Sequence, residues 1–182
     1  MLEISLHILD IVENSTRAGA SIVSIDIAED TAKDILSLEI RDNGSGMSED
    51  VLSKVIDPFF TTKTVRSVGL GLPMLAQAAE RAEGRFTIES KGGEGTRVTA
   101  DFKLSHFDRQ PLGDISGTLV TLIAGNVDVD IIYHHEHDGQ AYILDTREIK
   151  REIEDIPINH VTVLNFIRNN IIEGLKEIGA EA

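Results

Sequence analysis

The segment DNGSGM, Asp42 to Met47, combines residue types that suit the binding of a polar ring. It directly follows the alternating run LSLEIR, which predicts a β-strand. Asp42 would then stand at a strand end, where its carboxylate can accept a hydrogen bond from a ligand. Gly44 and Gly46 allow the following turn to lie close against that ligand. For an isolated DNG sequence the alternative is an Asx turn with no ligand.

A second set of candidate residues lies near the N-terminus. Apolar residues there recur three or four positions apart, which predicts an amphipathic helix that ends near Gly19. Asp10 and Asn14 are one turn apart on that helix and share a face. A carbonyl oxygen such as that of Asn14 can complete an oxygen shell around Mg²⁺. The Asp10 carboxylate can act as a general base toward water. We interpret His7, one turn earlier, as a partly buried helix residue rather than a catalytic group.

Three further segments carry glycines or hydroxyls suited to phosphate. DPFFTTK offers Thr61, Thr62 and Lys63 in a stretch without periodicity, which predicts a loop or lid. VGLGLPM places Gly69 and Gly71 before a predicted helix, where free backbone amides suit anionic oxygens. GEGT ends in Thr96. Taken singly, each segment has an ordinary loop or turn as its alternative.

Together with LDIVENSTRAGA, these segments resemble, in order and spacing, the nucleotide-binding boxes of the GHKL ATPase superfamily, over about residues 4 to 104. The superfamily includes sensor histidine kinases, gyrase-type topoisomerases, the ninety-kilodalton chaperones and MutL-type ATPases. The resemblance implies ATP and Mg²⁺ as cofactors. It implies that Asn14 binds magnesium and that Asp42 binds adenine, supported by Thr96 through a water. The DPFFTTK segment resembles the short ATP lid of sensor histidine kinases.

Asp10 departs from the superfamily pattern. ATP-hydrolysing branches and anti-sigma serine kinases have glutamate at this position, and sensor histidine kinases usually have asparagine. Aspartate keeps the carboxylate on a side chain one methylene shorter. We therefore expect an ATPase or protein kinase with slow hydrolysis or phosphoryl transfer to a partner protein. A non-catalytic ATP sensor or adaptor subunit is the alternative, and a DNA-repair-type clamp ATPase is disfavoured.

The order of predicted elements indicates an α+β fold. Up to about residue 104 the pattern is helix, two strands, short helix, loop, helix and two strands. The resemblance implies a Bergerat-type two-layer α/β sandwich, with helices on one face of a mixed, mostly antiparallel sheet. We expect residues 1–108 to form the ATP-binding domain. Residues 109–182 would form a small C-terminal α/β extension, used for partner binding or oligomerisation.

In that extension a helix capped by Asp114 precedes two strands joined at Asp138-Gly139, and two more helices follow. His134, His135 and His137 cluster beside this turn. Clustered histidines can bind a divalent metal. We favour a solvated hairpin tip instead, since no distant set of ligands completes a metal site.

Composition narrows the function classes. The chain has no cysteine, which excludes disulfides and thiolate metal sites. The net charge of -14 disfavours nucleic acid and anionic membrane surfaces as partners. We expect a cytoplasmic protein, because the N-terminus lacks a secretory signal and no apolar run could span a bilayer. With the first predicted helix at residue 4 there is no room for a phosphoacceptor hairpin, so we expect any protein substrate to be another polypeptide.

Overall fold

A computed structural model of the chain describes residues 2–55 and 71–180. In chain order, the helices and strands are α1 (Ile4–Arg17), β1 (Ile22–Asp30), β2 (Ile35–Asp42), α2 (Glu49–Leu52), α3 (Gly71–Arg81), β3 (Arg85–Lys91), β4 (Gly95–Lys103), α4 (Ile115–Gly125), β5 (Asp130–His137), β6 (Gln140–Asp145), α5 (Thr146–Glu152) and α6 (Val161–Glu177).

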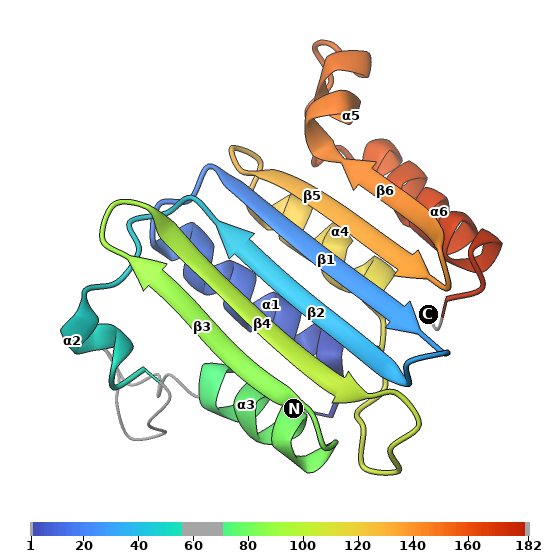
Figure 1. Ribbon diagram of the computed structural model, residues 1–182. Helices are drawn as coiled ribbons and strands as arrows, with labels where there is room; N and C mark the ends of the chain where they lie inside the picture. The colour runs from blue at the N-terminus through green and yellow to red at the C-terminus, as the bar shows by residue number, and fades with distance from the viewer. Residues whose placement is uncertain (1, 56–70, 181–182) are drawn as a thin grey trace.

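One twisted sheet of six strands forms the centre of the molecule, in the order β3-β4-β2-β1-β5-β6 (Figure 1). Every neighbouring pair is antiparallel except β1 and β5, which are parallel. Helices α3, α1, α4 and α6 lie side by side in that order on one face of the sheet. This confirms the predicted α+β fold of the Bergerat type.

The alternation of the central strands explains the two layers. Along β1 the side chains of Val23, Ile25 and Ile27 are buried, and their neighbours are only partly so. On α1 the buried apolar residues Ile4, Ile8, Ile11 and Val12 follow the helical repeat and form one stripe. Packing of this stripe on the buried side of the sheet creates the apolar core.

The C-terminal part of the chain continues the same sheet. Strand β5 pairs with β1 along its whole length, from Ile22 opposite Asp130 to Glu29 opposite His137. Helix α4 packs beside α1, and α6 packs on α4 and β6. The two parts therefore share one sheet and one core, and the division into domains at residue 108 stays a prediction.

Among the described residues, no helix combines the length and the apolar character that crossing a membrane requires.

Candidate nucleotide-binding site

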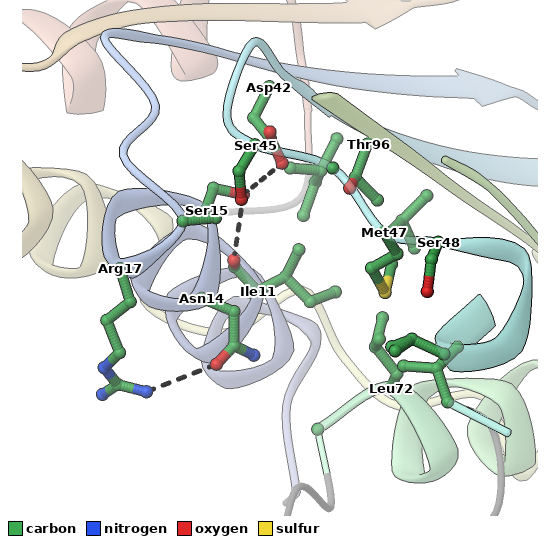
Figure 2. A pocket seen from close by; sticks show the side chains of 17 residues that line it. Ile11, Asn14, Ser15, Arg17, Asp42, Ser45, Met47, Ser48, Leu72 and Thr96 are labelled. Atoms are coloured by element: carbon green, nitrogen blue, oxygen red, sulfur yellow. Dashed lines mark hydrogen bonds between the residues drawn. The ribbon is translucent and has the colours of Figure 1, made fainter. Parts of the chain in front are cut away.

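A cavity of about 440 Å³ opens between α1, the end of β2 and the start of α3 (Figure 2). This volume lies in the usual range for small-molecule sites. Its walls are mainly apolar and carry a few polar groups. Its lining residues include Ile11, Asn14, Ser15, Ile40, Asp42, Gly46, Met47, Gly71, Leu72, Thr96 and Val98.

The carboxylate of Asp42 is oriented by two donors. The Ser15 hydroxyl on α1 donates to Oδ2 at 2.7 Å, and the Gly44 amide donates to Oδ1 at 2.8 Å. The second contact is the Asx turn considered above. Here the turn and a cavity-facing carboxylate occur together, because Asp42 also lines the cavity. Each oxygen retains a free lone pair with which it can accept a donor from a ligand.

The turn after Asp42 is tied to the β3–β4 turn. A Cβ added to Gly46, whose φ is +63°, would overlap the carbonyl oxygen of Lys91. Glycine is therefore needed at this position, because the two backbone turns pack closely there. Gly46 also lines the cavity. Gly44 is buried, and a Cβ added to it would come within 3.0 Å of the Ala18 carbonyl oxygen. Thr96 lies directly opposite Asp42 in the β2–β4 ladder, and its hydroxyl is 2.9 Å from that of Ser90.

The second polar group of the site lies further along α1. The Asn14 amide donates to Asp10 Oδ2 at 3.2 Å, and Arg17 donates to Asn14 Oδ1 at 3.3 Å. Asp10 Oδ2 also lies against Gly71, the first residue of α3, so closely that a Cβ at Gly71 would overlap it. The predicted pairing of Asp10 and Asn14 on one helix face thus produces a joined polar pair beside the N-terminus of α3.

His7 lies one helical turn before Asp10 in the sequence of α1 and is fully buried. Its Nε2 is 2.9 Å from Gln110 Oε1. Burial lowers the pKa of the His7 imidazole below its usual 6.5, with the Gln110 contact opposing that effect. His7 is thus a core residue of α1, more completely buried than the partial burial expected from sequence.

The structure brings six of the predicted site residues together in or beside one cavity: Asp10, Asn14, Asp42, Gly46, Gly71 and Thr96. Thr61, Thr62, Lys63 and Gly69 lie outside the described residues. Ser15 was missed by sequence reasoning. Its position next to Asn14, in a helix interior that serine does not favour, was the available signal.

The structure differs from the prediction for the cluster of His134, His135 and His137. His135 is fully buried, with Nδ1 2.6 Å from the Tyr133 hydroxyl and Nε2 2.8 Å from Glu29 Oε1. The solvated hairpin tip is therefore wrong for His135, because β5 is an inner strand whose buried face this side chain shares with Tyr133. His134 points to the other face, 3.4 Å from Asp26. The described residues contain no group of three or more histidine and carboxylate side chains placed to hold a metal.

The fold is a mixed sheet with helices on one face, and a mainly apolar cavity with a few polar groups lies beside the end of β2. Together with the family match, these features define a GHKL-type ATPase domain. The chain belongs to the family described as Histidine kinase-, DNA gyrase B-, and HSP90-like ATPase, which matches residues 3–106.

Similar curated proteins are bacterial sensors. The sensor histidine kinase AtsR of Burkholderia thailandensis is 25% identical over 180 residues, which is 93% of this chain and 28% of that protein. The sensor protein DegM of a Bacillus species is 34% identical over 91 residues, 50% of this chain and 24% of that protein. The chain thus spans less than a third of the length of either relative.

Two solved structures share the fold. The Aquifex aeolicus MutL ATPase domain complexed with ADP has a TM-score of 0.54 and 15% identity, covering 85% of this chain and 68% of that one. The N-terminal domain of a DNA repair protein has a TM-score of 0.55 and 15% identity, covering 99% of this chain and 57% of that one. At this identity the likeness concerns the fold alone.

Proposed function

We propose that this chain binds ATP with Mg²⁺ in the cavity and regulates a partner protein by slow hydrolysis or by phosphoryl transfer. The adenine would lie at the Asp42 end, between apolar walls formed by residues such as Ile40, Met47 and Val98. The phosphates would extend toward Asn14 and the N-terminus of α3, where backbone amides and the helix dipole favour anions.

The observation that carries this proposal is the oriented carboxylate of Asp42. Ser15 and Gly44 fix both of its oxygens on the wall of a mainly apolar cavity. A fixed acceptor in apolar surroundings can select a ring that carries an amine, because a ligand without that donor would leave a charged acceptor unsatisfied.

The side chains near Asn14 fit a magnesium ion that arrives with its nucleotide. Mg²⁺ prefers oxygen ligands and is usually bound by one or two protein groups together with phosphates and waters. Asn14 Oδ1 supplies such an oxygen, and the neighbouring carboxylate of Asp10 adds negative charge. When bound, the ion would neutralise charge on the phosphates. Arg17, which donates to Asn14 Oδ1, would have to release that oxygen.

Hydrolysis would depend on Asp10 as the general base. Its carboxylate would accept a proton from the attacking water, or from the hydroxyl of a protein substrate, as the γ-phosphoryl group is transferred. Asn14 donates to Oδ2, which leaves Oδ1 to receive that proton.

A non-catalytic sensor is the second candidate, and the same contacts support it. Asp10 is held between the Asn14 amide and Gly71. A carboxylate fixed there can orient Asn14 for magnesium without ever reaching a water. ATP would then act by stabilising one conformation of the surface presented to the partner. The partner is expected to be a protein, given that the relatives are named as sensor kinases.

One preparation tests both candidates, by calorimetric titration with ATP and Mg²⁺ beside steady-state phosphate release. Asp42→Asn should weaken ATP binding about 10- to 100-fold, since it removes a charge-assisted hydrogen bond. Unchanged ATP affinity in this variant would refute the adenine assignment. Asp10→Asn should abolish phosphate release and preserve ATP affinity if Asp10 is the base. Tight binding without release by the unmodified chain would favour the sensor.

A further inference from the structure

The two outer strands of the sheet differ in how they are protected from pairing with other strands. Strand β3 exposes Arg85, Glu89 and Lys91, and charges of this kind discourage the addition of a further strand. Strand β6, at the other edge, has the sequence QAYILD, in which Asp145 is the single residue charged at neutral pH. That carboxylate is already paired with Arg147 at 2.6 Å. Edge β6 therefore carries no unpaired charge to repel another strand.

The hairpin between β5 and β6 determines which backbone groups of β6 point outward. Asp138 and Gly139 both have positive φ, at +48° and +85°, which identifies a two-residue turn of type I′. The pair closing this turn, His137 and Gln140, forms the hydrogen-bonded kind of antiparallel pair. Because the two kinds alternate, Tyr142 and Leu144 also direct their amides and carbonyls toward β5. The amides and carbonyls of Ala141 and Ile143 and the amide of Asp145 then face away from the sheet. The Asp145 carbonyl, at the N-cap of α5, takes part in the first turn of that helix.

Apolar side chains flank this free edge on both faces of the sheet. Ile143 is 64% exposed on the face without helices. Phe166 is 63% exposed on α6, one turn before Asn170, which accepts a hydrogen bond from the Tyr142 hydroxyl of β6. Arg168, on the opposite flank of α6, reaches toward Asp114 at the start of α4. Phe166 therefore lies on the flank of α6 that faces away from α4 and toward Tyr142 of β6. Helix α6 itself lies beside β6, at the rim of the sheet (Figure 1).

We propose that β6 pairs antiparallel with β6 of a second copy of this chain, so that the two sheets become continuous. A twofold axis through the Ile143 pair would set Ile143 opposite Ile143, and Ala141 opposite Asp145 of the other copy. All of these residues have outward-facing backbone groups, and opposite residues lie on the same face, as the pleat requires. In this register the two Ile143 residues exchange two backbone hydrogen bonds, and each Asp145 amide donates to the Ala141 carbonyl of the other copy.

Charge favours self-pairing at this edge over the rest of the surface. The net charge of -14 makes two copies repel each other across most orientations. In the proposed register the Asp145 carboxylates are separated by the length of the strand, each beside its own Arg147 and opposite an alanine. No like charges of β6 face each other, and the exposed isoleucines contact across the axis.

Sedimentation equilibrium of the full chain over a wide concentration range tests this proposal. We expect a monomer–dimer equilibrium whose dissociation constant increases at least about tenfold in Ile143→Lys, because two ammonium groups would face each other across the axis. Ile143→Pro should weaken the dimer too, since it removes an outward amide that β5 does not use. Ile35→Lys is the matched control, because it changes an exposed isoleucine at the first residue of β2, an inner strand that is not part of the β6 edge.

Circular dichroism of each variant checks that the monomer stays folded. A dimer that is equally stable in both Ile143 variants would overturn the proposal. A chain that stays monomeric at every concentration would overturn it as well, and would leave the β6 edge for a strand of a different protein.

Discussion

Two hydrogen-bonded carboxylates stand at opposite ends of neighbouring strands, and their surroundings differ. Asp42, at the end of β2, is bound by Ser15 and Gly44 and lines a cavity. Glu29, near the end of β1, is bound by His135 and is only 5% exposed. Strands β1 and β2 are antiparallel, which places these two carboxylates at opposite ends of the sheet.

The difference shows that hydrogen bonding of a carboxylate does not by itself define a binding site. Around Glu29 the partners are core side chains, His135 and through it Tyr133, both fully buried. Around Asp42 the apolar packing leaves an open volume on one side. The same type of contact should therefore stabilise the fold in one region and position a ligand-binding group in the other. Substitutions in the two regions should separate stability from ATP affinity.

The largest effect is expected for His135→Leu. It would leave the Glu29 carboxylate and the Tyr133 hydroxyl buried without their partner, which should lower the free energy of unfolding by about 3 kcal/mol. Urea denaturation measures this loss, and calorimetry should show ATP affinity unchanged. His134→Leu, on the exposed face of the same strand, is the control and should change stability by less than about 0.5 kcal/mol. Equal effects of the two changes would contradict the buried network.

The next effect concerns the phosphate end of the cavity. Gly71→Ala would place a Cβ where Asp10 Oδ2 now lies and would force that carboxylate to rotate. If Asp10 is the base, phosphate release should fall up to about 100-fold, because a small displacement of a catalytic group is costly. ATP affinity should change less than turnover. The control is Gly125→Ala, at the end of α4, where an added Cβ meets no neighbouring atom among the described residues.

A smaller effect is expected for Ser15→Ala, which removes one of the two donors that orient Asp42. ATP binding should weaken about 3- to 10-fold, in keeping with the net value of one hydrogen bond. Thr16→Ala removes a hydroxyl from the adjacent residue, whose partner is the Glu13 carbonyl of the same helix. Calorimetry of the two variants side by side should show the loss only for Ser15. If both bind ATP like the unmodified chain, Ser15 does not position Asp42.

The smallest effect is a pH dependence of stability from His7. Its pKa is lowered by burial, so the unfolded chain binds more protons than the folded chain once the pH falls below the usual 6.5. This residue should therefore destabilise the fold as the pH decreases, by at most about 0.7 kcal/mol between pH 7 and pH 6. Urea titrations at the two pH values should show a smaller decrease for His7→Gln. A steeper decrease in that variant would contradict a neutral, buried imidazole.

Local patterns in the sequence were sufficient to predict the elements and several residues that the fold gathers at one cavity. The alternation in β1 and β2 and the helical repeat of α1 identify those elements because each buries one side. Motif order predicted Asp42 and Thr96 as site residues, and the β2–β4 ladder places the two opposite each other. The predicted role of Gly46 was incomplete, since the sequence does not show that Lys91 approaches it.

Long-range contacts account for what the sequence did not predict. Nothing local indicates that Ser15 faces Asp42 across 27 positions of sequence. The burial of His135 follows from the pairing of β5 with β1, and a histidine-rich segment beside a turn is by local criteria solvated. Parallel pairing depends on a crossover through distant residues and leaves no short-range signature.

The parallel pairing of β1 with β5 also bears on how the chain is made. During synthesis the N-terminal residues emerge first, so β1 and β2 can form their hairpin long before residues 130–137 exist. Until then the other edge of β1, one of the most apolar strands of the sheet, has no neighbour and can pair with strands of other nascent chains. Completion of the sheet must wait for residues 130–145, and a chain cut off before them would expose an unpaired edge of β1 that favours aggregation.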